Sequence, residues 1–368
     1  MRPVRILALS PVPEEGASAR FRVYQYIPAL EANGFQITVS PFYTPEFFHI
    51  LYQKGDYGRK ALIFTMLALK RWKVLSERRD YDLFFIHREV LPIGPPVIEM
   101  VLSRVAGRAL VYDFDDAIYL PNVSEANRFV GLLKWPQKVS RIIRASDCVV
   151  AGNQYLAQYA RSYNKAVTVI PTCIDTTKFV ARTEGNSGRD DPVVGWIGSP
   201  TTVPYLLSLR EVLRRTAGSH RFTLHVSGAG GAGEVPGVRV ANLPWSIEQE
   251  ASLFNTCDIG IYPLWDDAWT RGKCGFKSIQ FMACGVPVVA SAVGVNREII
   301  QDGVNGFLAA TEDEWVEKLG WLLSDRRLRE KLGQAGRRTV EEHYSLTVST
   351  PLLISALKEV MERTRGTG

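Results

Sequence analysis

Three cations, Arg271, Lys273 and Lys277, alternate with the glycines Gly272 and Gly275 in one short segment. A strand is expected before this segment, and a helix is expected to begin near Gly275. Glycines let the backbone approach a ligand closely, and the free N–H groups at the start of a helix attract anions. The segment therefore predicts a diphosphate-binding loop, with a solvated basic turn as the alternative.

A second strand-to-helix loop contains Gly198, Ser199 and Thr201. Its backbone N–H and hydroxyl groups are suitable donors to a phosphate. A Ser or Thr that caps the next helix explains the same residues without a ligand.

Carboxylates and a histidine follow two predicted strands of the first half. Asp113, Asp115 and Asp116 come after one strand, and His87 ends another. The carboxylates could accept hydrogen bonds from sugar or acceptor hydroxyls, hold a metal, or cap the next element. We expect Asp113 or Asp116 to contact substrate. For His87, a polar loop is the competing interpretation.

Lys and Arg residues gather at both ends of Gly58–Arg79, and Ala61–Leu69 between them is nearly all apolar. This pattern is typical of a helix that lies on an anionic membrane. A core-facing helix with solvated ends explains it equally well.

Positioning these loops requires strands that end at one edge of a sheet. The first half alternates short apolar runs with amphipathic stretches, which indicates βαβ units around a parallel sheet. Strands are expected at Val4–Leu9, Gln36–Ser40, Asp82–Ile86, Ala109–Tyr112, Cys148–Ala151 and Val167–Ile170. Helices are expected near 20–33, 58–79, 95–105, 127–145 and 153–163.

The same rhythm restarts after the polar stretch 181–191, which we interpret as a linker. Strands are expected at Val193–Ile197, Thr223–Ser227, Val238–Ala241, Asp258–Tyr262 and Val288–Ser291. Helices are expected near 203–216, 247–255, 275–284, 312–323, 326–343 and 346–363. The predicted fold is α/β, with one Rossmann-like domain at 1–180, a second at 192–345, and a C-terminal helix and tail at 346–368 that cross back to the first domain.

Composition places the chain among ordinary globular proteins, with 46% apolar and 22% charged residues. Residues 1–180 contain 23 Lys or Arg against 16 Asp or Glu, so the basic excess lies in the first half. It favours an acidic partner such as a phosphorylated substrate, an anionic membrane or nucleic acid, and a basic surface that merely keeps the protein soluble explains it equally well. The five cysteines form no CxxC pair, so neither a zinc site nor a disulfide framework is expected.

The run from Gln280 to Ser291, the following segment Val293–Leu308 and the motif Trp196-Ile-Gly-Ser-Pro resemble the second domain of the GT-B glycosyltransferases. The subgroup is the retaining "group 1", or family 4, enzymes. The resemblance covers residues 193–345, whereas the first domain matches only in layout. It implies two doubly wound domains that face each other across a cleft.

Several residue roles follow from the resemblance. It implies that Gly198, Ser199, Thr201, Gly275, Gln280 and Glu298 bind the donor, and that Arg271, Lys273 and Lys277 act on its diphosphate. A glycine-containing loop after the first strand lies near the acceptor in such enzymes, so the acceptor-binding candidates are Gly16, Ser18, Arg20, Arg22 and His87.

This chain departs from the family pattern at two positions. Relatives carry two glutamates eight residues apart, where this chain has Gly272 and Gln280. An amide hydrogen-bonds a ribose hydroxyl more weakly than a carboxylate does. Glu298 occupies the usual position of an acidic residue beside the nucleotide, or it simply suits the first turn of a short helix.

The resemblance implies transfer of a sugar from a nucleotide-diphosphate sugar to an acceptor hydroxyl, with retention and without a metal or other cofactor. We expect the acceptor to be a glycan, a lipid-linked or a small molecule, as in cell-surface glycan biosynthesis. The expected location is cytoplasmic, at the inner face of the membrane, without nucleic acid as a partner. The alternatives are a sugar-nucleotide epimerase of the same fold and a non-catalytic nucleotide- or glycan-binding protein.

Overall fold

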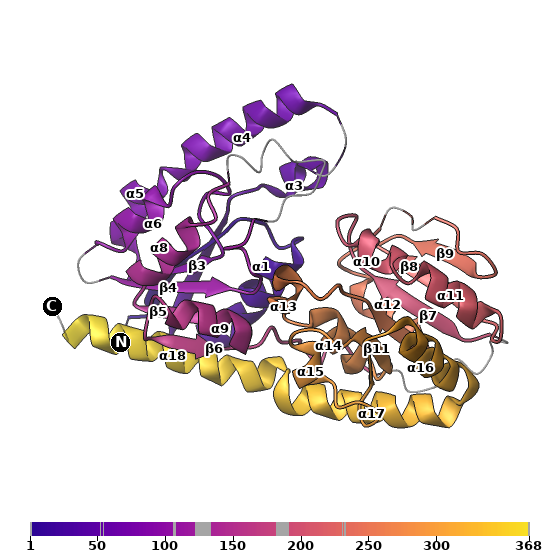
Figure 1. Cartoon of the computed structure of the whole chain (residues 1–368). Coiled ribbons are helices and arrows are strands. Elements are labelled where there is room, and N and C mark those ends of the chain that lie inside the picture. The colour runs from indigo at the N-terminus through magenta and orange to yellow at the C-terminus, as the bar shows by residue number, and fades with distance from the viewer. Residues whose placement is uncertain are drawn as a thin grey trace. The chain divides into compact units, whose positions relative to one another are not determined.

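The computed structural model describes residues 2–51, 53, 55–105, 108–121, 134–181, 191–229, 231 and 233–366. The chain folds into two compact units: unit 1 is Met1–Thr172 with Ser349–Gly368, and unit 2 is Cys173–Val348. Each unit is built around one six-stranded sheet flanked by helices (Figure 1). The stretch 181–191, predicted as the linker, lies largely outside the described residues.

All strands of the unit 1 sheet are parallel, and all six were predicted. The order across the sheet is β2-β1-β3-β4-β5-β6. Every residue of the central strands β3, β4 and β5 is buried, which explains why their sequences are continuous apolar runs. The strands are β1 (Val4–Ser10), β2 (Phe35–Pro41), β3 (Leu83–His87), β4 (Ala109–Phe114), β5 (Cys148–Ala151) and β6 (Val167–Val169).

The unit 2 sheet is also parallel, in the order β12-β11-β10-β7-β8-β9. Five of its strands were predicted, and β12 was missed. The strand β12 is only three residues long, and its pairing of Phe307 with Val289 on β11 defines it rather than any periodicity. The strands are β7 (Val193–Ile197), β8 (Thr223–Ser227), β9 (Arg239–Leu243), β10 (Ile259–Tyr262), β11 (Val288–Ser291) and β12 (Phe307–Ala309).

The described helices of the two units connect these strands. Those in unit 1 are α1 (Ala17–Arg22), α2 (Ile27–Ala32), α3 (Pro45–Leu51), α4 (Tyr57–Arg71), α5 (Val74–Glu77), α6 (Val97–Leu102), α8 (Lys138–Ala145) and α9 (Gln154–Arg161), with 3₁₀ turns η1 (Tyr24–Tyr26) and η2 (Arg78–Asp80). Those in unit 2 are α10 (Val203–Leu207), α11 (Arg210–Ala217), α12 (Glu250–Asn255), α13 (Ala268–Arg271), α14 (Phe276–Ala283), α15 (Asn296–Ile299), α16 (Glu312–Ser324) and α17 (Arg326–His343).

The last helix, α18 (Leu346–Gly366), begins in unit 2 and belongs to unit 1 from Ser349 onwards. This confirms the prediction that the C-terminal helix returns to the first domain.

Three predicted helices are broken in the structure. The helix expected at 20–33 is divided into α1, η1 and α2: Val23 leaves the helical conformation after α1, and Pro28, which has no N–H, lies in the first turn of α2. The helix expected at 58–79 ends as α4 at Arg71 and continues as α5 and η2. The helix expected at 203–216 is divided between α10 and α11. Residues 127–133 of another predicted helix lie outside the described residues.

Two glycines allow the strands at the centre of unit 2 to pack tightly. A Cβ atom on Gly260 in β10 would overlap the Phe281 ring of α14, and one on Gly195 in β7 would overlap the Cys257 side chain. Both strands can therefore lie directly against bulky neighbours, and α14 sits close to the sheet.

This packing predicts that Gly260→Ala destabilises unit 2. The added methyl group has no space beside Phe281, so we expect a loss of about 1–3 kcal/mol in the free energy of unfolding. Urea denaturation measures the change. The matched control is Gly58→Ala in α4, where a Cβ meets nothing within 4 Å. Equal effects of the two substitutions would contradict the packing argument.

Candidate functional site

In unit 2, the candidate donor loops leave the two strands where the sheet changes direction. Strands β7 and β10 are neighbours, and the chain builds the sheet outwards from them in opposite directions. The loops after their carboxyl ends contain Gly198–Thr201 and Arg271–Gly275. Ligands of doubly wound sheets bind in the crevice at this topological switch point, so the sheet order brings the two predicted donor segments to the same edge.

The loop after β10 is held in a defined shape. Asp267 and Thr270 form a reciprocal capping box at the start of α13. Gly275, with φ of 64°, caps α14 in the left-handed conformation, and a Cβ there would overlap the Ile299 side chain. The N-cap residue of α14 is this glycine, which has no side chain of its own to cap the helix. The start of a helix favours an anion.

The three predicted cations have different partners around this helix start. Arg271 is exposed and pairs with Asp266 at 2.7 Å. Lys273 is half-buried and lies over the Trp269 ring. Lys277, in the first turn of α14, donates to the Gln280 side-chain oxygen at 2.7 Å. The structure thus gathers the cations in one loop and the first turn of one helix.

Buried polar residues stabilise this loop, and the sequence alone did not predict them. Asn296 is fully buried, donates to the Ser291 carbonyl at 3.0 Å and lies 3.5 Å from the Ser278 hydroxyl. The Ser291 hydroxyl accepts a hydrogen bond from the Leu264 N–H. These contacts tie the loops after β10 and β11 to α14. Asn296 lies two residues before Glu298, which is itself exposed in α15.

Gln280, the position where relatives carry a glutamate, is fully buried. Its amide nitrogen lies 3.3 Å from an Oε1 of Glu250, a residue of α12 that is 4% exposed. A carboxylate is therefore present beside position 280, but it comes from another helix. Nothing in the sequence motif indicated Glu250, because it lies 30 residues upstream and only the tertiary fold brings it here.

In the loop after β7, two backbone N–H groups donate hydrogen bonds to other groups of the protein. The Gly198 N–H donates to the Ser227 carbonyl at 3.0 Å, and the Ser199 N–H donates to the Thr202 hydroxyl at 2.9 Å. In this structure, these two N–H groups do not point towards a ligand as the sequence interpretation assumed. The Ser199 and Thr201 hydroxyls lie 2.9 Å apart on the exposed side of the loop.

In unit 1, the candidate acceptor residues lie at the corresponding switch point between β1 and β3. The His87 Nδ1 lies 2.7 Å from an Asp113 oxygen, and its Nε2 lies 3.3 Å from the Ser18 hydroxyl. Arg22 forms a forked ion pair with Asp113 and donates to the Ile170 carbonyl at 2.6 Å. The sequence predicted these side chains as separate candidates. In the structure they contact one another in one continuous network.

The inner residues of this network are too deeply buried to contact a substrate in this structure. His87, Asp113 and Arg22 are at most 2% exposed, so in this structure they contact one another, whereas Ser18 at the outer end is half-buried. Burial alone would raise the pKa of the Asp113 carboxyl. The charge of Arg22 and the hydrogen bond with His87 outweigh burial and hold that pKa below its ordinary range.

The other two carboxylates after β4 are held by one arginine. Arg88 donates to Asp115 at 2.7 Å and to Asp116 at 2.5 Å. Its φ of 61° is unusual for a residue other than glycine. Burial would raise the pKa of Asp115, but Arg88 lowers it. Asp116, predicted as a substrate contact, is thus already bound to a cation.

The loop after β1 is fixed by its own contacts. The Arg20 guanidinium donates to the Glu14 carbonyl at 2.9 Å and the Glu15 carbonyl at 3.2 Å. A Cβ on Gly16 would overlap the Val12 side chain, so the loop closes tightly on itself at this glycine. Arg20 therefore shapes the loop that carries Ser18.

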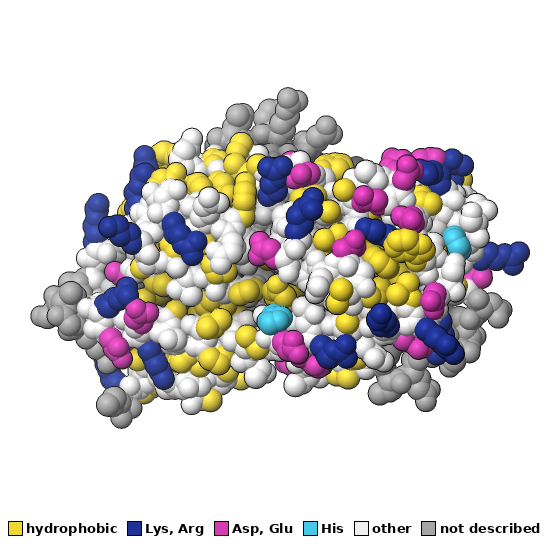
Figure 2. Space-filling model, turned by 60° about the horizontal axis from the view of Figure 1, so that its bottom comes forward, with side chains coloured by type: hydrophobic (Ala, Val, Ile, Leu, Met, Phe, Trp, Pro, Cys, Tyr) yellow, Lys and Arg dark blue, Asp and Glu magenta, His cyan; other side chains and the backbone are white. Residues whose placement is uncertain are grey.

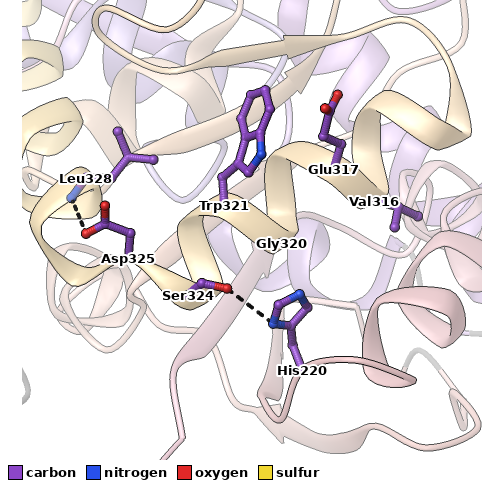
Figure 3. A pocket seen from close by; sticks show the side chains of 8 residues that line it. All are labelled: His220, Val316, Glu317, Gly320, Trp321, Ser324, Asp325 and Leu328. Carbon is purple, nitrogen blue, oxygen red and sulfur yellow. Dashed lines mark hydrogen bonds between the residues drawn. The ribbon is translucent and has the colours of Figure 1, made fainter.

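A surface hollow of about 520 Å³ lies elsewhere in unit 2, on one face of α16. Figure 3 shows His220 facing Ser324 across it, with Trp321 and Glu317 also on α16. The His220 Nδ1 lies 3.5 Å from the Ser324 hydroxyl. None of the predicted site residues lines this hollow, so it is separate from the loops described above.

No group of three or more His, Cys, Asp or Glu side chains in the described ranges could hold a metal ion. No helix in the part of the chain that the structure describes is long and apolar enough to cross a membrane.

The buried pair in unit 1 predicts a strong dependence of stability on Arg22. Arg22→Met should lower the free energy of unfolding at pH 7 by about 3–5 kcal/mol, because Asp113 loses its cation while buried. Adding Asp113→Asn should recover part of that loss, as urea denaturation of both variants would measure. Additive losses would contradict the pairing. In the wild type, the contribution should be full above pH ~3.9 and be lost as the pH falls through the lowered pKa.

The contact between Gln280 and Glu250 predicts that restoring the family's residue alone is harmful. Gln280→Glu places two buried carboxyl groups together and raises the pKa of one of them. Stability should then fall as the pH rises above ~4.3, where unfolded carboxyls ionise. Urea denaturation at pH 7 should find the single variant about 1–3 kcal/mol less stable than Gln280→Glu/Glu250→Gln. Equal stability of the two would exclude the proximity argument.

Comparison with known proteins adds to this geometry. Residues 191–325 match the family model described as "Glycosyl transferases group 1". D-inositol 3-phosphate glycosyltransferase from Nocardia farcinica is 26% identical over 241 residues, which is 56% of this chain and 52% of that protein. The chain spans about half the length of the curated relatives it matches.

Solved structures resemble the whole fold at low sequence identity. Sucrose-phosphate synthase from Thermosynechococcus elongatus has a TM-score of 0.71 at 17% identity, covering 99% of this chain and 100% of that one. Anabaena HepE in complex with UDP-glucose has a TM-score of 0.71 at 18% identity, covering 96% of this chain and 99% of that one. Residues 191–325 are thus similar to the group 1 glycosyl transferases, and the chain has the GT-B fold.

Proposed function

We propose that this chain is a glycosyltransferase that moves a sugar from a nucleotide-diphosphate sugar to an acceptor hydroxyl. The observation that carries the proposal is the loop before α14. Its cations Arg271, Lys273 and Lys277 gather around the start of α14, at the switch point of a sheet. Solved relatives of this fold contain UDP or UDP-glucose, which supports a nucleotide-sugar donor.

The proposed chemistry requires stabilisation of a leaving group. As the bond between the anomeric carbon and the diphosphate oxygen breaks, negative charge develops on the diphosphate. Cations and helix N–H groups that are already in place stabilise that charge without reorganisation. Lys277 is the central candidate, because it lies in the first turn of α14 and its ammonium group is held by the Gln280 side-chain oxygen. Gly275 and Gln280 then shape the site rather than react.

We further propose that the transfer proceeds with retention by front-side attack. The acceptor oxygen bonds to the anomeric carbon on the face that the diphosphate leaves, and the diphosphate oxygen takes the acceptor proton. This step requires no enzyme nucleophile, metal or cofactor. Glu250, beside Gln280, supplies a carboxylate to the donor region, where relatives have a glutamate at position 280 itself.

On the acceptor side, Ser18 is the group we propose to contact substrate in unit 1. Its hydroxyl is half-buried, and His87 fixes its orientation. Asp113 and Arg22 act through His87 as positioning residues, because all three side chains are buried. A glycan, lipid-linked or small-molecule hydroxyl acceptor, a role in cell-surface glycan synthesis and a location at the inner face of the membrane complete the proposal.

The test uses Lys277→Ala and a panel of sugar nucleotides. Removing one preorganised charge-stabilising group should reduce kcat about 10²–10³-fold, with the fold intact. Lys331→Ala, an exposed position on α17, is the matched control and should keep full activity. The donor panel is first ranked by the rise in melting temperature that each compound produces.

The outcomes separate the alternatives. Transfer of label from donor to acceptor, with the anomeric configuration of the product determined by NMR, supports the proposal and tests retention. An isomerised donor without any acceptor product would identify an epimerase. Binding without turnover would identify a nucleotide-binding protein. Near-normal activity of Lys277→Ala would overturn the role given to this lysine.

A further inference from the structure

Helix α4 lies at the outer edge of unit 1 (Figure 1), and it carries an exposed apolar stripe. Leu62, Met66 and Leu69 are each between 62% and 68% exposed. Their spacing of four and three residues places them on one face of the helix. The helix and its C-cap residue hold five of the fourteen large exposed apolar side chains of the described residues. Such a concentration on one helix marks an interaction surface.

The opposite face of α4 explains why the helix is anchored in this orientation. Phe64 packs edge-on against the Phe42 ring, with 5.2 Å between ring centroids. Arg71 is buried and donates to the Ser40 carbonyl at 2.9 Å. Burial lowers the pKa of Arg71 to about 10. These contacts pack the inner face of α4 against unit 1, so the stripe of Leu62, Met66 and Leu69 is exposed and can contact a partner.

The charges around the stripe identify the partner's chemistry. On the face of the molecule in Figure 2, basic and acidic side chains are interspersed. Residues 57–73, in contrast, contain no Asp or Glu and five Lys or Arg, of which only Arg71 is buried. Arg59 lies three residues before Leu62, and Lys73 lies four residues after Leu69, so cations stand at both ends of the stripe. Lys73 also forms an ion pair with Glu77 at 3.1 Å, and both partners are partly exposed.

We propose that α4 docks this chain onto an anionic lipid bilayer. Leu62, Met66 and Leu69 enter the boundary between headgroups and acyl chains, while Arg59, Lys70 and Lys73 contact lipid phosphates. An amphipathic helix with Lys and Arg beside its apolar face binds membranes in this way, through buried apolar area and attraction to anionic lipids. A second copy of the chain fits this surface less well, because it would bring the same cations together.

The experiment is co-sedimentation of the full chain with vesicles that contain equal parts of phosphatidylglycerol and phosphatidylcholine, compared with pure phosphatidylcholine. The wild type should bind the anionic vesicles, and binding should fall when NaCl is raised from about 0.1 M to about 1 M. The vesicles contain neither donor nor acceptor, so the result is independent of the transfer activity.

Two variants test the two components of the surface. Leu62→Ser/Met66→Ser/Leu69→Ser should weaken vesicle binding about tenfold or more, because it removes the inserting side chains. Arg59→Gln/Lys70→Gln/Lys73→Gln should weaken it about fivefold for each cation removed. Circular dichroism and melting temperature should change little, since these side chains are mostly exposed.

Matched controls separate this surface from general effects of hydrophobicity or net charge. One control replaces three scattered apolar residues of 44–47% exposure by Ser, at Leu207, Val304 and Leu352. The other replaces the exposed cations Lys165, Lys331 and Arg338 by Gln, which removes the same charge. Both controls should bind anionic vesicles almost as the wild type does.

Three results would overturn the proposal. The first is no binding of the wild type to anionic vesicles. The second is equal loss of binding in the α4 variants and their controls. The third is concentration-dependent dimerisation in sedimentation velocity that the Leu62, Met66 and Leu69 substitutions abolish, because the stripe would then be an interface between copies of this chain.

Discussion

Because both sheets are parallel and their central strands are buried, the chemistry of this chain is confined to the loops that leave the carboxyl ends of those strands. A parallel strand flanked by helices has no water on either face, so its residues must be apolar. The polar side chains therefore appear where β1, β3 and β4 end in unit 1, and where β7, β10 and β11 end in unit 2. Each sheet reverses its winding at one point, which brings two of these loops together.

The same constraint determines how polar groups are paired beneath the loops. Asp113 is buried, and a buried carboxylate is stable only with compensating charge and hydrogen bonds, which Arg22 and His87 provide. In unit 2, Gln280 and Glu250 meet in a buried contact where one amide and one carboxylate can share a hydrogen bond. Both arrangements hold an outer residue in place: Ser18 in the first case and Lys277 in the second.

Helix α4 differs from these regions because its polarity is inverted. Its inner face holds a buried arginine, and its outer face holds leucine and methionine. No element of the sheet requires that arrangement. Phe64 and Arg71 anchor the inner face of the helix to unit 1. The apolar outer face is suited to the proposed lipid environment. The proposed membrane surface and the proposed transfer site are therefore built from separate elements of the chain.

Local pattern was enough to predict eleven of the twelve strands, the two-domain α/β fold and the return of the last helix, because apolar runs and helix periodicity are properties of neighbouring residues. The sequence also predicts a diphosphate-binding loop in the segment Arg271–Lys277, since its cations and glycines are contiguous. It did not determine whether α4 faces the core or solvent, because both faces of that helix contain apolar residues. Only the tertiary structure joined Ser18, His87, Asp113 and Arg22, which lie on separate βα units, and placed Glu250 beside Gln280. Contacts of that kind depend on the order of strands in the sheet and on the packing of distant helices, and no local pattern in the chain encodes them.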